Sequence, residues 1–228
     1  MNKDTVEHIF FDLDHTLWDF EKNSEETLTH LFHKYGIGDG NVALQDFLSA
    51  YRKANFELWE LYNFSKVTKE EIRDRRFPMT FTTIGLDPTT TPPTIGQEYL
   101  EICPRKPNLI PGTRELLSSL EGKYTMHILS NGFDATQAVK LETTGIGQYF
   151  STVVTSESCG HKKPSAEIFD FALQQAGASK ENSIMIGDNP ITDIKGAKEY
   201  GLPTIYFGTE TTVADIEIDN LLLILEHL

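Results

Sequence analysis

Residues 6–16 read VEHIFFDLDHT, an apolar run that ends on a pair of acids. Val, Ile and Phe are common in strands, and an apolar run without polar alternation is typical of a strand buried on both faces. The stretch therefore predicts a buried strand over residues 6–11 that leads directly into Asp12.

After Pro111 and Gly112 the chain alternates between helical and strand patterns. Ser165 is the expected N-cap of one of these helices. Strands are predicted at 124–129, 152–155, 183–186 and 203–207, and helices at 113–120, 135–144, 166–176, 193–200 and 220–228. Strands that alternate with helices favour an α/β fold built on a parallel sheet.

Between Glu21 and about Thr83 the apolar residues recur at helical spacing. Thr68 and Glu71 have the spacing of a capping box, so one helix is predicted to begin there. A helical block inserted after the first strand predicts a smaller α-helical cap domain. The predicted division is a catalytic core of residues 1–18 and 105–228 and a cap of residues 19–104.

The composition of the 228 residues, with 39% hydrophobic and 24% charged, is typical of a globular protein. A formal net charge of −14 repels a phosphate backbone, so binding to a nucleic-acid polymer is not expected. Two cysteines, Cys103 and Cys159, do not make a disulfide framework. No apolar run reaches the ~18 residues of a membrane span, and residues 1–5 lack a secretory pattern. We expect a cytoplasmic protein with no membrane contact; monomer and dimer both remain open.

Asp12 and Asp14 follow the first predicted strand, at the end of a sheet where ligands bind in parallel folds. Asp12 is placed to attack phosphorus and form a mixed anhydride. Asp14 could protonate the leaving oxygen and then take a proton from water. Neighbouring acids tend to separate their pKa values, which suits this division of roles. The alternative is a pair of solvated turn aspartates.

Ser130, Asn131 and Gly132 follow the second predicted strand. The serine hydroxyl and the backbone N–H groups after it could hold a phosphate oxygen. The alternative is an ordinary turn after a strand.

Two lysines stand before Pro164 and a predicted helix. An ammonium held at that position could neutralise charge that develops on a phosphoryl group. We favour Lys163 over Lys162 because it abuts the proline, although exposure is the usual fate of lysine.

Asp188 and Asp193 follow the strand predicted at 183–186. Mg²⁺ prefers oxygen ligands and usually keeps waters and a substrate phosphate oxygen among them. Asp188 and Asp12 could therefore supply the protein's part of a magnesium site. Asp193 would then hold a metal-bound water or Lys163. The alternative for Asp193 is an acid that merely favours a helix N-terminus.

These motifs together resemble those of the haloacid dehalogenase superfamily of phosphatases. The resemblance implies a Rossmann-like core with the smaller class of helical cap. It implies Asp12 as nucleophile, Asp14 as general acid/base, and phosphate binding by Thr16 and Ser130 steadied by Lys163. It also implies a Mg²⁺ ion between Asp12, the Asp14 backbone carbonyl and Asp188.

Three runs, residues 130–133, 137–145 and 163–177, are further similar to the bacterial pyrimidine 5′-nucleotidases of this superfamily. That similarity implies a small-molecule phosphomonoester as the partner, with UMP- or dUMP-like nucleotides, noncanonical ones included, as substrates. A phosphosugar or phosphoglycolate is the alternative substrate. A haloacid dehalogenase, which needs neither metal nor a second acid, and a receiver-like signalling module are the less favoured functions.

Trp18 and Phe20 follow the first motif, where they could stack on a base. The favoured interpretation is ordinary apolar packing.

Overall fold

The computed structural model describes residues 5–228, so the expectation for the N-terminal residues lies outside them, Thr5 excepted. The chain divides into two compact units, Met1–Phe20 with Pro107–Leu228, and Glu21–Lys106. We call the first the core unit and the second the helical unit. Each boundary falls two residues beyond the predicted one.

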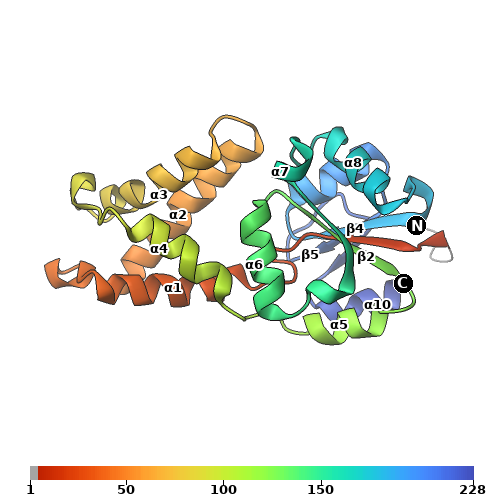
Figure 1. Cartoon of the computed structure of the whole chain (residues 1–228), viewed down its shortest axis with the longest axis horizontal. Helices are drawn as coiled ribbons and strands as arrows, with labels where there is room; N and C mark the ends of the chain where they lie inside the picture. Colours follow the sequence, from red (N-terminus) through yellow and green to blue (C-terminus); the bar gives the residue numbers. More distant parts are fainter. Residues whose placement is uncertain (1–4) are drawn as a thin grey trace. The chain divides into compact units, whose positions relative to one another are not determined.

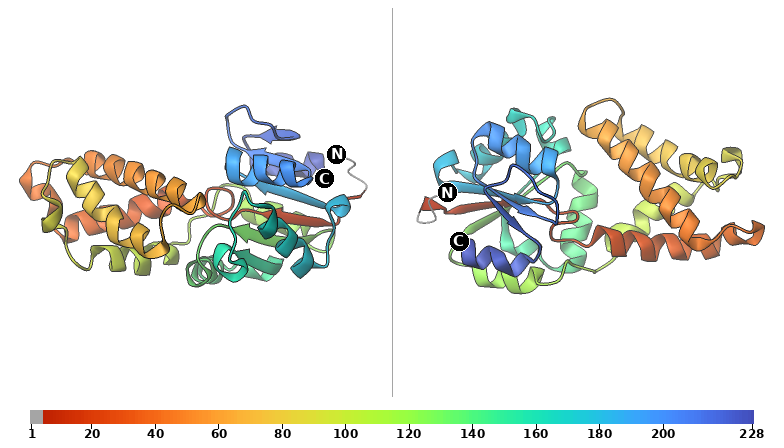
Figure 2. Two further views of the ribbon diagram at one scale, coloured as in Figure 1. Left: turned by 90° about the horizontal axis from the view of Figure 1, so that it is seen from above. Right: turned by 180° about the vertical axis from the view of Figure 1, so that it is seen from behind.

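The core unit is built on a parallel sheet of order β3-β2-β1-β4-β5-β6 (Figures 1 and 2). Its strands are β1 (His8–Phe11), β2 (Thr125–Ser130), β3 (Phe150–Thr155), β4 (Ser183–Gly187), β5 (Thr204–Phe207) and β6 (Ile216–Ile218). The order is that of a doubly wound Rossmann fold, in which ligands bind where the strand order reverses. The predicted α/β fold and its five strands are confirmed, whereas β6 was not predicted.

β1 lies between β2 and β4, and its last three residues are buried on both faces of the sheet. On one face Phe10 packs in a cluster with Met185 of β4 and with Ile168 and Phe169 of α8 (Ala166–Ala176). Helices α5 (Thr113–Leu120) and α10 (Ile224–His227) lie together on the other side (Figure 1). Cover on both sides explains why the first strand has no polar alternation.

The remaining helices of the core unit are α6 (Asp134–Thr144), η5 (Gly147–Tyr149), α7 (Ser156–Cys159), η6 (Lys180–Asn182), η7 (Pro190–Lys195), α9 (Gly196–Tyr200) and η8 (Leu221–Leu223). Helices predicted at 135–144, 193–200 and 220–228 are present with differences of one to a few residues at their ends, whereas the short helices η5, α7 and η6 were not predicted. The helix predicted at 193–200 is a π-helical turn followed by α9. Ser165 is the N-cap of α8, although its side chain makes no capping bond.

The helical unit carries α1 (Phe20–Lys34), η2 (Ile37–Gly40), α2 (Leu44–Asn63), α3 (Lys69–Thr83), η3 (Pro88–Thr90), α4 (Ile95–Ile102) and η4 (Cys103–Arg105). The predicted capping box is confirmed, because the Thr68 hydroxyl accepts from the Glu71 amide at 3.2 Å and the Glu71 carboxylate accepts from the Thr68 amide at 2.8 Å. Arg76 is buried with its guanidinium over the rings of Tyr51 and Tyr99. None of the helices within residues 5–228 combines the length and apolar composition that a membrane crossing requires.

The chain leaves the core unit and returns to it at neighbouring points. The Asp19 amide donates to the Asn108 carbonyl at 3.2 Å, and the Ile110 amide donates to the Leu17 carbonyl at 3.0 Å. The two connecting segments are therefore hydrogen-bonded to each other within the core unit.

Two histidines and a threonine are in contact across three neighbouring strands: His8 on β1, His127 on β2 and Thr152 on β3. His127 is fully buried, stacks on Phe10, and has ring nitrogens 3.1 Å from His8 Nδ1 and 2.8 Å from the Thr152 hydroxyl. Burial, and after it the charge on His8, lowers the pKa of His127 from 6.5 to about 4. The folded protein therefore holds this ring neutral at pH values where the unfolded chain protonates it.

We expect His127 to make the protein less stable as the pH falls from about 6.5 to about 4. Between these pH values the unfolded chain binds a proton at His127 that the folded chain does not bind. The free energy of unfolding therefore falls by at most about 3 kcal/mol. Urea unfolding of the wild type and of His127→Gln between pH 7 and pH 4 measures it. The variant should lose less unfolding free energy over this range. The exposed His30→Gln variant is the control, and parallel curves for wild type and His127→Gln would contradict the assignment.

Candidate active site

The carboxylate of Asp12 stands directly beyond the central strand. Its backbone amide continues the sheet by donating to the Ile186 carbonyl at 2.9 Å, and the residue is 7% exposed. The end of β1 therefore fixes the direction in which this side chain leaves the sheet.

The segment after Asp12 turns back on itself. The Trp18 amide donates to the Leu13 carbonyl at 2.8 Å, and His15 takes a left-handed conformation with φ of 64°. The turn buries Thr16, whose hydroxyl donates to Asp188 Oδ1 at 3.1 Å. Trp18 is also fully buried, which supports packing over stacking on a base.

Lys163 contacts Asp12 although the two residues are 151 positions apart in the sequence. Its ammonium lies 2.7 Å from Asp12 Oδ1, 2.7 Å from Asp193 Oδ1 and 2.6 Å from the Leu129 carbonyl. Burial alone would lower the pKa of Lys163, but the two carboxylates raise it above its usual value. Lys162 is only half-buried, so the structure places the favoured lysine, and not its neighbour, among the acids.

Asn131 holds the backbone of Lys163 in place. Its side-chain carbonyl accepts from the Lys163 amide at 2.8 Å, and its amide donates to the Lys163 carbonyl at 2.9 Å. The Ser130 hydroxyl accepts from the Gly132 amide at 3.0 Å. Ser130, Asn131 and Gly132, the residues predicted to bind phosphate, thus lie beside the loop that carries Lys163. The Asn131 side chain is hydrogen-bonded to the backbone of that loop.

Asp193 enters the site from a widened turn. The Ile194 amide bonds to the carbonyl of Asn189, five residues earlier, as in a π-helix, and the Asn189 amide donates to Asp193 Oδ2 at 3.0 Å. A Cβ atom at Gly187 would lie 2.3 Å from Asp193 Oδ2, so the glycine makes room for this carboxylate. Single π-helical turns of this kind are frequent at functional sites.

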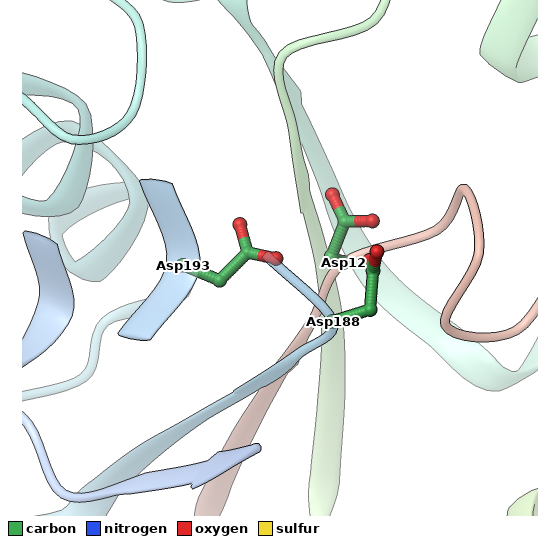
Figure 3. A group of neighbouring side chains, drawn as sticks. All are labelled: Asp12, Asp188 and Asp193. Atoms are coloured by element: carbon green, nitrogen blue, oxygen red, sulfur yellow. The ribbon is translucent and has the colours of Figure 1, made fainter. Parts of the chain in front are cut away.

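Asp12, Asp188 and Asp193 form an acidic group, and an oxygen of each lies within 4.8 Å of the others. Figure 3 shows Asp12 and Asp188 side by side, with Asp193 turned toward them. Burial, then the charge of Asp193, raises the pKa of Asp188 to about 8. Burial also raises the pKa of Asp12 well above its usual value, against the lowering effect of Lys163. If all three acids are ionised, the group together with Lys163 carries two negative charges in excess, a charge that a bound divalent cation would balance.

Asp14 has partners that were not predicted from the sequence. Lys140 Nζ lies 2.5 Å from Asp14 Oδ1, and Gln137 Nε2 donates to Asp14 Oδ2 at 2.9 Å. Burial acts to raise the pKa of Asp14, but the Lys140 charge and these hydrogen bonds outweigh it and lower the pKa. The structure therefore brings all predicted site residues to one edge of the sheet and adds two from α6.

The arrangement combines a buried acid paired with an ammonium, a second oriented acid and three neighbouring carboxylates that could hold a metal ion. The chain matches the family of haloacid dehalogenase-like hydrolases over residues 9–207. It belongs to that family. The predicted superfamily membership and the expectation of an enzyme are confirmed.

Two curated relatives of this hydrolase are similar over most of their length. Pyrimidine 5′-nucleotidase PynA of Streptococcus pneumoniae is 33% identical and is matched over 87% of this chain and 82% of its own. Pyrimidine 5′-nucleotidase YjjG of Escherichia coli is 34% identical, over 87% and 84%.

A solved structure of the HAD-hydrolase YfnB from Bacillus subtilis, bound to magnesium, is similar throughout. Its TM-score is 0.86 at 27% identity, with 98% of this chain and 99% of that chain covered.

Proposed function

We propose that this hydrolase removes phosphate from small phosphomonoesters through a phosphate bound covalently to Asp12, with Mg²⁺ as cofactor. The observation that supports this most is the Asp12 carboxylate at the end of the central strand, with Oδ1 held 2.7 Å from Lys163 inside the acidic group. A fixed carboxylate with a neutralising ammonium beside it suits in-line attack on phosphorus, which depends on positioning and charge.

In the proposed reaction an Asp12 oxygen bonds to phosphorus while the ester bond breaks. Asp14 gives a proton to the leaving oxygen and later takes one from the water that attacks the phosphoaspartate. Thr16, Ser130 and backbone N–H groups at 131–132 would hold the other phosphate oxygens. Lys163 would neutralise charge on the phosphoryl group as it transfers.

The residues present fit Mg²⁺. All donors are oxygens, which suit this hard ion, and its charge would balance the two excess negative charges of the acidic group with Lys163. Asp12, Asp188 and the Asp14 backbone carbonyl would hold it, while Asp193 orients Lys163 at 2.7 Å. When bound, the ion would stabilise negative charge on the phosphoryl oxygens.

For the substrate we propose pyrimidine nucleoside 5′-monophosphates of the UMP and dUMP type, noncanonical bases included. This proposal is supported by two relatives that are called pyrimidine 5′-nucleotidases and match at 33% and 34% identity. It is also in keeping with the net charge of −14, since a single small phosphate can be met by local cations where a polymer is repelled.

The experiment is a screen of phosphomonoesters with and without Mg²⁺. We expect UMP and dUMP to be hydrolysed with higher kcat/KM than purine nucleotides, sugar phosphates and phosphoglycolate. Chelation by EDTA should lower turnover by about a hundredfold or more, because the ion stabilises charge by several kcal/mol, and added Mg²⁺ should restore it.

Other outcomes separate the parts of the proposal. Faster turnover of a sugar phosphate would reject the nucleotide assignment and keep the phosphatase. Activity on a 2-haloacid that is indifferent to EDTA would identify a dehalogenase. A long-lived phosphoprotein without turnover would favour a receiver-like module.

A further inference from the structure

Helix α6 directs two side chains, one turn apart, at the same carboxylate. Gln137 and Lys140 are 0% and 5% exposed, and each donates to a different oxygen of Asp14. Gln137 Nε2 also donates to the Ser130 hydroxyl at 2.7 Å. The helix thus fixes the orientation of Asp14 and links it to a residue of the proposed phosphate site.

Burying these groups is costly, so packing alone is a poor explanation for them. A buried ammonium loses its hydration, and interactions with its partners must offset the free energy of that loss. Lys140 has Asp14 and the face of the Trp18 ring, 4.5 Å from Nζ to the ring centre. Gln137 Oε1 is buried without a hydrogen-bond partner within residues 5–228. An apolar residue would avoid that loss, whereas only a donor can hold Asp14.

The Gln137 side chain is also fitted closely to its neighbour. A Cβ atom at Gly132 would lie 2.1 Å from Gln137 Nε2. The glycine therefore leaves space for the amide to reach Asp14 and Ser130 together.

We infer that Lys140 and Gln137 are positioning residues that orient Asp14 for the second half of the reaction, in which water hydrolyses the phosphoaspartate. This inference rests on the proposed phosphatase function. These donors hold the Asp14 carboxylate in one orientation through both of its oxygens and leave lone pairs that could take a proton from water.

In this second half of the reaction one water molecule hydrolyses the phosphoaspartate. The water oxygen forms a bond to phosphorus, the bond from phosphorus to the Asp12 oxygen breaks with its electron pair, and one water proton passes to Asp14. Inorganic phosphate leaves, and Asp12 returns to its carboxylate form.

The test uses p-nitrophenyl phosphate, because its phenolate leaves without needing a proton and the first half then does not depend on Asp14. We expect Lys140→Met to release p-nitrophenolate in a burst stoichiometric with enzyme. A steady state at least about tenfold slower than wild type should follow, since general base catalysis contributes about 10²- to 10⁴-fold. In a two-step reaction kcat and KM then fall together, so kcat/KM stays near the wild-type value.

Matched variants separate this role from a structural one. Lys140→Arg should restore most of kcat, and Gln137→Met should give the same pattern with a smaller loss. Exposed Lys123→Met should behave as wild type, and thermal unfolding should show every variant folded. If Lys140→Met fails to fold, Gln137→Met carries the same test.

Two results would overturn the inference. Equal losses in kcat and kcat/KM without a burst, in an active wild-type background, would reject the positioning role and leave the phosphatase standing. A wild-type enzyme that hydrolyses no phosphomonoester would reject the proposed function and this inference with it.

Discussion

Asp12→Asn is expected to lower phosphomonoester turnover by at least about a thousandfold, an increase of about 4 kcal/mol in the activation barrier. An amide oxygen at this position is a far weaker nucleophile than a carboxylate, so the covalent phosphate cannot form at a useful rate. Steady-state turnover of UMP and of p-nitrophenyl phosphate measures the loss. Trapping with labelled substrate should find no phosphoprotein.

The same variant is expected to keep its fold and to unfold at an equal or higher temperature. Asn removes one negative charge from a buried group that holds three carboxylates, and Lys163 keeps its contact with Asp193 at 2.7 Å. Functional acids crowded together commonly cost stability. Asp170→Asn, on the exposed surface of α8, is the control. Retained turnover by Asp12→Asn would remove Asp12 from the mechanism.

Lys163→Met is expected to reduce both activity and stability. It deletes a fully buried ammonium that contacts Asp12 and Asp193 and leaves those carboxylates without it. Removing one partner of a buried ion pair costs about 3–5 kcal/mol, and losing a charge that stabilises the transition state costs about a hundredfold or more in kcat. Urea unfolding and steady-state kinetics measure the two losses.

A double substitution tests the cause of the instability. If unpaired carboxylates are responsible, Lys163→Met combined with Asp193→Asn should be less destabilised than the sum of the single changes. Lys162→Met is the control for the neighbouring lysine and should leave both properties near wild type. Additive single and double changes would show that the pairing contributes nothing.

The sheet could be predicted because its signals are local. The apolar run at residues 9–11 fits a strand covered on both faces, and helices alternating with strands leave few arrangements other than a parallel sheet. β6 (Ile216–Ile218) escaped prediction because three residues at the edge carry too little pattern. The helix expected at 193–200 begins as a π-helical turn, in which the Asn189 amide donates to the carboxylate of Asp193, and such a contact is not encoded in a local sequence pattern.

The acids and Lys163 could be predicted because each follows a strand or precedes a helix at a fixed place in the fold. Lys140 and Gln137 could not, because on a helix their spacing is that of any exposed face. Their partner Asp14 is 126 and 123 residues away in sequence, so only folding reveals the contact. The functions of Asn131 and Gly187 in supporting the lysine and Asp193 likewise depend on approach distances that sequence does not contain.

The hydrogen bonds from Asp19 to Asn108 and from Ile110 to Leu17 bring the two connecting segments of the helical unit together at one point of the core. The stretch between them can therefore be deleted, lengthened or exchanged without interrupting any strand of the core sheet. A change confined to that stretch would leave every residue of the proposed active site, all of which lie within 12–16 and 130–193, unaltered.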